Sequence, residues 1–315
     1  MTFAARMEHR AEIACLCPSL VVRYTAARFR AEPIPRIADE TSMHTITANG
    51  AQIPAIGLGV MTLKEETCVQ AVDAALRMGY RHIDTAQMYG NEREVGEGLR
   101  ASGIERAEVF VTTKVWHDRL RAGDFERSVD ESLQRLNLSA VDLLLIHWPN
   151  KDVPLKETID ALCKTKRAGK TRHIGVANFT VALVEEAAKL AVEPLVTNQI
   201  EVHPFIDRSK VIAASRRHGL AITAYCPIAR GAAPGDAVLA RIGAAQGKSP
   251  AQVSLRFLVQ QDIVPIPRSA NPQHIADNLA VFDFTLSDAE MAELRGLGRA
   301  DKRIVSPPHA PQWDG

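Results

Sequence analysis

The sequence predicts an α/β protein: a (β/α)8 TIM barrel that is preceded by a β-hairpin and followed by an extra helix and a tail. Starting at Ile56, short apolar runs alternate with amphipathic segments eight times over roughly 240 residues, which is the unit count and length of such a barrel. Polar and titratable residues recur where these apolar runs end. Hydrophobic residues make up 46% of the 315-residue chain and charged residues 24%, which are ordinary values for a globular protein.

The hairpin is expected over residues 44–54, where the pattern alternates around Asn49-Gly50, two residue types that tolerate positive φ. Strands are then expected at residues 56–59, 81–84, 109–114, 141–147, 172–176, 195–199, 221–225 and 263–266. Apolar residues at helical spacing predict helices at residues 65–79, 91–101, 124–137, 155–168, 180–190, 208–218, 236–246, 250–260, 272–280 and 287–297.

A doubly wound sheet is the rival fold, and it requires a G-x-G-x-x-G turn after its first strand. Gly57-Leu58-Gly59 supplies only the first half of that spacing, because Thr62 stands where the third glycine belongs. We therefore interpret Gly57 and Gly59 as packing residues.

Charge and cysteine usage narrow the classes of partner. The formal net charge is +1, from 38 basic and 37 acidic residues, so the chain has no global field for nucleic acid or for an anionic membrane. Its five cysteines form no CxxC pair, which argues against a disulfide framework or a zinc site and favours a reducing cytoplasm. No heptad seam is visible, so a monomer is the default expectation.

Residues 1–42 fit the barrel pattern poorly. A weakly apolar stretch at residues 13–22 follows Arg6 and Arg10, but Pro18 interrupts it and acidic residues precede it, unlike a signal peptide. We expect these residues to be a disordered extension or the product of a start codon assigned too early. Residues 43–315 are then a single domain.

Titratable side chains stand at or just past the ends of the first expected strands. Asp84 and Tyr89 follow one strand, Lys114 ends the next, and His147 ends the third. The carboxyl ends of the strands of a barrel converge on one mouth, so these residues are expected to be neighbours. Later strand ends are expected to add Asn178, Gln199, Tyr225, Arg268 and Ser269 to the same mouth.

This set of groups suits proton transfer to a carbonyl. A tyrosine has an ordinary pKa near 10, and a neighbouring lysine ammonium favours its phenolate and lowers that pKa. Asp84 can hold Lys114 beside Tyr89, and His147 can donate to a developing oxyanion. The alternative interpretation is that Asp84 and Lys114 form only a structural ion pair.

The motifs around these residues resemble the aldo-keto reductase family, and most closely its bacterial 2,5-diketo-D-gluconic acid reductases. The resemblance covers Thr45 to about Asp314 and rests on six stretches in the order of the family: His82 to Tyr89 with Asn91-Glu92, Thr113 to Trp116, Leu145 to Pro149, Gly175 to Phe179, Asn198 to Glu201 and Ile266 to Ser269. The tail, with Ile304 to Pro307 and Gln312 to Asp314, matches as well.

The resemblance implies a catalytic tetrad of Asp84, Tyr89, Lys114 and His147, with Tyr89 as general acid. It also implies that NADPH binds without a Rossmann fold: Asn178 and Gln199 hold the nicotinamide amide, and Tyr225 stacks on its ring. Ala177 stands where the family usually has a serine that hydrogen-bonds the nicotinamide amide. If nothing replaces that hydrogen bond, cofactor binding loses roughly 0.5–1.5 kcal/mol.

At the phosphate end, Arg268 and Ser269 precede Asn271-Pro272, which look like the cap and first residue of a helix whose N–H groups favour an anion. The second phosphate-binding arginine of the family is His274 here, and the adenine pocket has Asp277 before the usual Asn278. Histidine is mostly neutral at pH 7. We expect NADPH to be preferred over NADH, by less than in a relative with arginine, and more strongly as the pH falls.

Bulky residues near the expected mouth are substrate-pocket candidates, although such residues often serve only packing: Met61, Trp116, His117 and Trp148. Small polar carbonyls such as 2,5-diketo-D-gluconate, methylglyoxal and other dicarbonyls or aldehydes are the expected substrates. A nucleotide-binding sensor with little turnover is the alternative. A metal-dependent hydrolase is disfavoured, since Asp84 and His147 alone make no metal site.

Overall fold

Eight parallel strands surround the core of the computed structural model, which describes residues 44–314. They are β3 (Leu58–Gly59), β4 (His82–Asp84), β5 (Phe110–Val115), β6 (Val141–Ile146), β7 (Thr171–Ala177), β8 (Leu195–Glu201), β9 (Ala221–Tyr225) and β10 (Ile263–Pro265). They pair in chain order from β3 to β10. The N–H groups of Gly57 and Gly59 donate to the carbonyls of Pro265 and Pro267, at 3.0 Å each, and so close the sheet between its first and last strands. The expected (β/α)8 barrel is confirmed.

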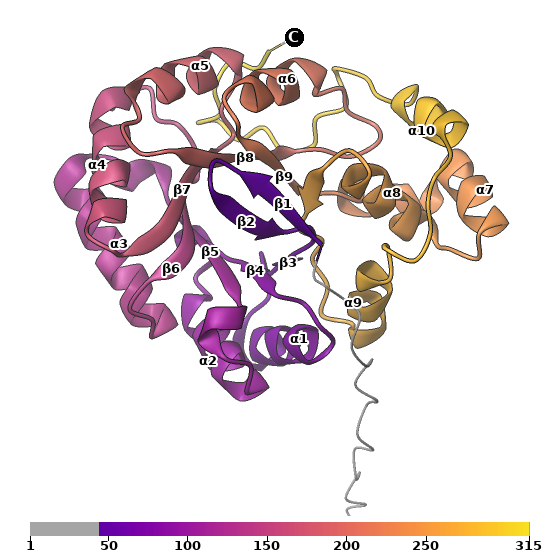
Figure 1. Cartoon of the computed structure of the whole chain (residues 1–315), viewed down its shortest axis with the longest axis horizontal. Coiled ribbons are helices and arrows are strands. Elements are labelled where there is room, and N and C mark those ends of the chain that lie inside the picture. Colours follow the sequence, from indigo (N-terminus) through magenta and orange to yellow (C-terminus); the bar gives the residue numbers. More distant parts are fainter. Residues whose placement is uncertain (1–43, 315) are drawn as a thin grey trace, which may run out of the picture. The chain divides into compact units, whose positions relative to one another are not determined.

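Helices cover the outside of this ring (Figure 1). They are α1 (Glu65–Arg77), α2 (Glu92–Ser102), α3 (Ala122–Leu136), α4 (Leu155–Arg167), α5 (Val181–Leu190), α6 (Ser209–Arg217), α7 (Ala237–Ala245), α8 (Pro250–Val259), α9 (Pro272–Leu279) and α10 (Asp288–Arg295). Each strand is followed by at least one helix, and α10 is the extra C-terminal helix that the sequence predicts.

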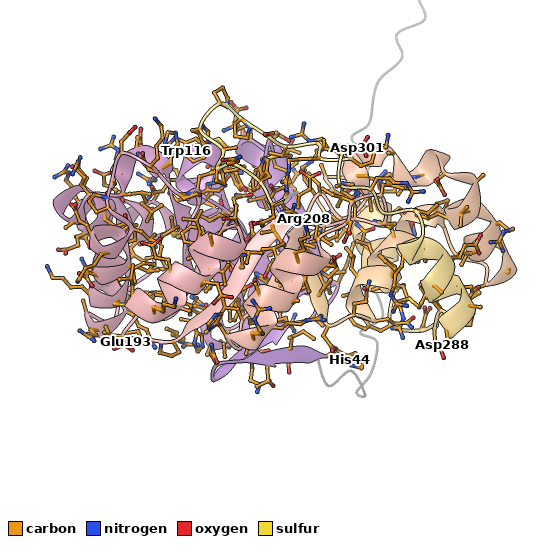
Figure 2. All side chains as sticks on the ribbon, turned by 90° about the horizontal axis from the view of Figure 1, so that it is seen from above. His44, Trp116, Glu193, Arg208, Asp288 and Asp301 are labelled. Carbon is orange, nitrogen blue, oxygen red and sulfur yellow. The ribbon has the colours of Figure 1, made fainter. Side chains whose placement is uncertain are left out.

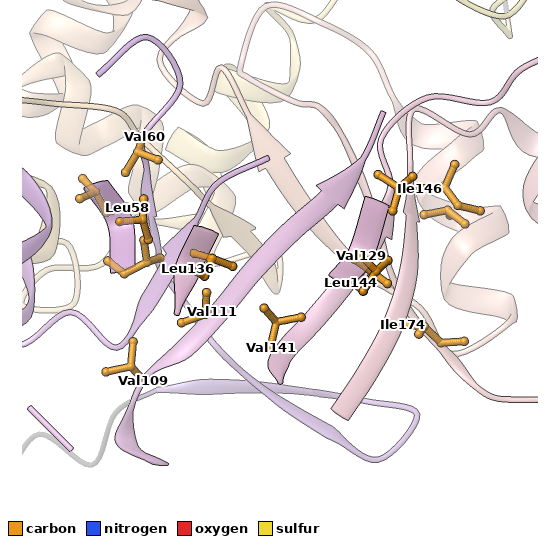
Figure 3. Close-up of a cluster of buried hydrophobic side chains, with 14 of the residues drawn as sticks. Leu58, Val60, Val109, Val111, Val129, Leu136, Val141, Leu144, Ile146 and Ile174 are labelled. Carbon is orange, nitrogen blue, oxygen red and sulfur yellow. The ribbon is translucent and has the colours of Figure 1, made fainter. Parts of the chain in front are cut away.

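The strands are buried on both faces, as β6 illustrates. Leu144 and Ile146 face the helices and join a large apolar cluster with Val129 of α3 (Figure 3). Leu143 and Leu145 belong instead to the cluster inside the barrel. Successive side chains of a strand point to opposite faces, so the continuous apolar run of β6 fills both layers.

The expected hairpin closes one end of the barrel. Strands β1 (Thr45–Ala48) and β2 (Ala51–Pro54) pair antiparallel across Asn49 and Gly50, which have φ values of 44° and 86°. The hairpin lies across the centre of the strand ring in Figure 1, and the fully buried side chain of Ile53 belongs to the inner cluster. The Asn49 amide donates to the Leu195 carbonyl at 2.7 Å, which fastens the turn to β8.

Gly57 and Gly59 are packing residues, as their incomplete dinucleotide motif suggests. A Cβ atom at Gly59 would lie 2.8 Å from the carbonyl oxygen of Ile266, and one at Gly57 would lie 2.7 Å from the ring of His82. Any side chain would therefore obstruct the closure of the sheet, and the doubly wound alternative is wrong.

The observed bounds of the helices agree with the expected bounds to within about two residues, which is the usual uncertainty of helix ends. The sequence patterns miss the short 3-10 turns, including η1 (Gln87–Tyr89) and η3 (His117–Arg119), because three residues carry no periodicity. The expectation for residues 1–42 lies outside the described residues.

Candidate active site

Four titratable side chains meet at the carboxyl ends of neighbouring strands. Asp84 is the last residue of β4, Tyr89 ends η1, Lys114 lies in β5 and His147 directly follows β6. This end of the barrel lies opposite the hairpin: Trp116, just past β5, and His44, just before β1, lie on opposite sides in Figure 2. The parallel register places these residues together because it aligns Asp84 with Thr112 and Lys114 with Leu145.

Lys114 and Asp84 form a buried ion pair. The Lys114 ammonium donates to Asp84 Oδ1 at 2.6 Å and to the Thr85 carbonyl at 2.7 Å, and the two side chains are 0% and 1% exposed. Burial lowers the pKa of Lys114, while the Asp84 carboxylate acts in the opposite direction. The second Asp84 oxygen accepts from the Gln199 amide at 2.7 Å. Both partners are therefore held in one position.

Tyr89 places its hydroxyl beside this pair. Lys114 Nζ lies 3.4 Å from Tyr89 Oη and 5.0 Å from the centre of the ring. The expectation of a lowered pKa for this phenol is wrong, because burial, followed by the Asp84 charge, raises the pKa of Tyr89 well above its usual value. The phenol consequently holds its proton at neutral pH, as a proton donor must.

His147 completes the group. Its ring lies edge-on to that of Tyr89, with the ring centres 5.7 Å apart. Burial, and then the positive charge of Lys114, lowers the pKa of His147 well below its usual value, so the imidazole is neutral. Its buried Nδ1 has no hydrogen-bond partner in the described part of the chain. A neutral imidazole carries one N–H donor, and His147 can offer it to a ligand.

Asn178, Gln199 and Tyr225 lie in one hydrogen-bonded network with the tetrad residues. The Tyr225 hydroxyl donates to Asn178 Oδ1 at 2.7 Å, and Asn178 Nδ2 donates to the His147 carbonyl at 2.9 Å. Asn178 has a φ of 62°, a conformation that asparagine tolerates better than most residues. A primary amide has two N–H groups and two lone pairs, so both Asn178 and Gln199 retain capacity for a nicotinamide amide.

The phosphate-end residues lie at the start of α9. Asn271 caps this helix by accepting from Gln273 N–H at 2.9 Å, and Pro272 is its first residue. Arg268 and His274 are exposed beside the cap. An exposed guanidinium and an imidazole at a capped helix N-terminus fit the chemistry of a phosphate group.

The remaining phosphate-end residues of the prediction are more enclosed. Ser269 Oγ accepts from Asn271 N–H at 3.0 Å, and Asn278 is buried. Asp277 accepts from Gln273 Nε2 at 2.8 Å. Ser269 therefore supports the cap, and Asp277 is tied to its own helix.

Three of the four substrate-pocket candidates gather around His309, a tail residue that no sequence pattern predicts. His117 stacks on His309 at 4.1 Å between ring centres, while Trp116 and Trp148 meet it edge-on at 5.2 and 5.3 Å. Trp116 also lies 5.0 Å from the His147 ring. The fourth candidate, half-buried Met61, follows Val60, whose N–H donates to the Asp84 carbonyl.

The tail reaches this position because Glu201 anchors it. This fully buried carboxylate at the end of β8 accepts from the N–H groups of Ile304 and Val305 at 2.7 and 2.8 Å, and from His203 at 3.1 Å. Asp314 then accepts from Val181 N–H at the start of α5. Glu201 stands at a strand end like the tetrad residues, and that position is the signal that could have found it.

A cavity of about 550 Å³ lies between the tail and the loop after β6. His117, Pro149, Val153, Leu183 and His309 are among the residues that line it. The tetrad side chains do not line it. The cavity is therefore separate from the tetrad.

Comparison with known proteins identifies the family. Residues 55–299 match the model of the aldo/keto reductase family. Methylglyoxal reductase DkgB of Escherichia coli O157:H7 is 41% identical over 266 residues, which cover 83% of this chain and 99% of that protein.

Solved structures agree with this match. A protein provisionally named 2,5-diketo-D-gluconic acid reductase B is 48% identical and superposes with a TM-score of 0.85, covering 87% of this chain and 98% of that one. An aldo-keto reductase of Bombyx mori in complex with NADP is 34% identical, with a TM-score of 0.78 and coverage of 84% and 95%. This chain is therefore a member of the aldo/keto reductase family and an NAD(P)H-dependent oxidoreductase.

Proposed function

We propose that this protein is an NADPH-dependent reductase of small polar carbonyls, with methylglyoxal and 2,5-diketo-D-gluconate as candidate substrates and Tyr89 as the proton donor. The observation that carries the proposal is the buried Lys114–Asp84 pair with its ammonium 3.4 Å from the Tyr89 hydroxyl. The names of the relatives, methylglyoxal reductase and 2,5-diketo-D-gluconic acid reductase B, support the substrate class.

The side chains divide the work according to their protonation states. Tyr89, protonated because its pKa is raised, gives its proton to the carbonyl oxygen as charge develops there. The Lys114 ammonium stabilises the phenolate that remains, and Asp84 keeps that ammonium charged and in position. His147, neutral because its pKa is lowered, orients the carbonyl by donating one hydrogen bond to it.

The nicotinamide supplies the hydride when NADPH is bound. Asn178, Gln199 and Tyr225 would hold the nicotinamide end, since they join the tetrad in one network. Arg268, Ser269 and His274 would hold the 2′-phosphate end, with Asp277 and Asn278 beside the adenine. We expect NADH to bind as well, because His274 replaces an arginine that would hold the 2′-phosphate of NADPH. Equal NADPH/NADH selectivity at pH 6 and pH 8 would contradict a charge-dependent role of His274.

We propose that the reaction takes place in the cytoplasm, where cysteine thiols stay reduced. Cys68, Cys163 and Cys226 are free cysteines. No helix within residues 44–314 is long and apolar enough to cross a membrane.

The test follows the absorbance of reduced nicotinamide with methylglyoxal and 2,5-diketo-D-gluconate, first with NADPH and then with NADH. We expect oxidation of both cofactors that depends on the carbonyl, with a higher kcat/KM for NADPH. Tight NADPH binding without oxidation by any aldehyde or ketone of a broad panel would refute the proposal and favour a nucleotide sensor.

A further inference from the structure

Two arginines lie together beneath the tail, outside the tetrad and its network. Arg208 is in the loop between β8 and α6 and is 7% exposed, and Arg303 is half-buried just before the anchored tail residues. Both guanidinium groups lie by the Trp313 indole, with Cζ atoms 3.5 Å (Arg303) and 5.7 Å (Arg208) from the ring centre. We name these two residues the arginine pair.

Four donors of the arginine pair have no hydrogen-bond acceptor in the part of the chain that the structure describes. Nε and Nη2 of Arg208 and both Nη atoms of Arg303 are buried without a hydrogen-bond partner among residues 44–314. Buried polar groups in proteins are nearly always hydrogen-bonded, so four orphaned donors in one place require an explanation. Burial, and then the positive charge of Arg303, lowers the pKa of Arg208 to about 10, so the guanidinium still carries its charge at neutral pH.

Neighbouring carboxylates do not supply the missing acceptors. Glu201 uses both oxygens on the N–H groups of Ile304 and Val305 and on His203. Asp314 accepts from Val181 N–H at the start of α5. Neither carboxylate forms an ion pair with Arg208 or Arg303 in the described part of the chain, although both lie close enough to affect the pKa of Arg208. The donors therefore suit an oxyanion from outside the chain.

The position of the arginine pair favours the substrate over the cofactor phosphates. Trp313 lies 6.0 Å from Trp148, the residue next to His147, and its Nε1 is fixed to Ser306 Oγ at 3.0 Å. Arg208 lies toward the side of Trp116 rather than that of His44 (Figure 2). The phosphate-end residues belong instead to α9, which follows β10.

We propose that Arg208 and Arg303 form an oxyanion-binding site that receives the carboxylate of an acidic carbonyl substrate. A guanidinium donates two parallel N–H bonds to a carboxylate, and such bonds are stronger than those between neutral groups. The inference rests on the proposed carbonyl reduction. Such a site makes this enzyme selective for keto acids and aldehyde acids over neutral carbonyl compounds of the same length.

The test compares succinic semialdehyde, which carries a carboxylate, with butanal, which has the same carbon chain without it. The ratio of their kcat/KM values should fall about ten- to a hundredfold in Arg208→Gln and in Arg303→Gln, because a charged hydrogen bond is lost. Arg208→Lys should retain part of the ratio, since it keeps the charge. Arg295→Gln, at an exposed position of α10, is the matched control and should leave the ratio unchanged. An unchanged ratio in both glutamine variants would refute the site.

Calorimetry with sodium gluconate, a sugar acid without a ketone or aldehyde to reduce, tests the site without turnover when the enzyme carries the reduced cofactor. The NADPH-loaded wild type should bind gluconate, and folded Arg208→Gln should not. Inorganic phosphate binding as tightly as gluconate would reveal a general anion site and overturn the substrate assignment. A weakened NADPH affinity in Arg208→Gln with an unchanged substrate ratio would assign the arginine pair to the cofactor instead. If no carbonyl is reduced at all, the proposed function fails, while gluconate binding still decides on the site.

Discussion

The two ends of the barrel are built in opposite ways. At the hairpin end, Ile53 is packed among aliphatic side chains and Asn49 has its amide satisfied by backbone carbonyls. At the mouth, Lys114 and Asp84 are both fully buried as an ion pair. Buried charges cost stability, and they are retained where function needs them. Stability and chemistry are therefore assigned to separate ends of the same strands.

The largest expected effect distinguishes two tyrosines. Tyr89→Phe removes the proposed proton donor and should lower kcat by about 10²- to 10⁴-fold, with NADPH binding retained in a fluorescence titration. Tyr80 is fully buried, unlike the partly buried Tyr89, and its hydroxyl donates to the Ile275 carbonyl at 3.2 Å, away from the tetrad. Tyr80→Phe should therefore leave kcat nearly unchanged. Equal losses of kcat in the two variants would show that the assay measures folding rather than chemistry.

The next effect tests the hairpin end. Ile53→Ala should lower the free energy of unfolding by about 2–5 kcal/mol, because it removes a fully buried side chain and leaves a cavity. Urea denaturation measures this loss, and kcat of the folded fraction should not change. Val192→Ala, at a side chain that is 65% exposed, is the control and should change stability by less than about 0.5 kcal/mol. A large loss of kcat in Ile53→Ala would contradict the division between the two ends.

A smaller effect is the pH dependence at the hairpin end. Burial lowers the pKa of His82 to about 4. The unfolded chain takes up this proton near pH 6.5 and the folded protein only near pH 4, so His82 contributes stability above pH 6.5 that is lost as the pH falls. At pH 5 the loss should be about 2 kcal/mol. Urea unfolding at pH 7 and pH 5 measures it, and His82→Gln should flatten this part of the pH profile; an equal slope in the variant would assign the effect to other groups.

The smallest expected effect lies at the cofactor end. His274→Arg restores a permanent charge at the start of α9 and should raise the NADPH/NADH ratio of kcat/KM only a few-fold, since exposed ion pairs contribute about 0.2–1 kcal/mol. Steady-state kinetics with both cofactors measures the ratio. Gln273→Arg, one residue away on the same turn, is a control for a general gain of positive charge. A matching rise in that control would show that the position of residue 274 has no special role.

The barrel and the meeting of the tetrad residues could be predicted from the sequence, because the alternation of strands and helices dictates which strand ends converge. The direction in which the pKa of Tyr89 shifts could not be predicted from the sequence. It depends on burial by side chains from several strands, and the Lys114 charge suggests the opposite sign. The positions of His309 and Arg303 were also out of reach, since the tail has no periodicity. Glu201 determines the path of the tail through hydrogen bonds that no pattern encodes.

The closure of the sheet by Gly57 and Gly59 has a consequence for synthesis on the ribosome. Their hydrogen-bond partners, the carbonyls of Pro265 and Pro267, belong to the last strand region to be made. Until that region emerges, the nascent chain carries an unpaired edge at β3 while most of its apolar surface has already been translated. Open strand edges are templates for aggregation, and contacts between distant parts of a chain form slowly. We therefore expect the final ring closure, rather than the formation of any single strand–helix unit, to limit the yield of folded protein in the cell.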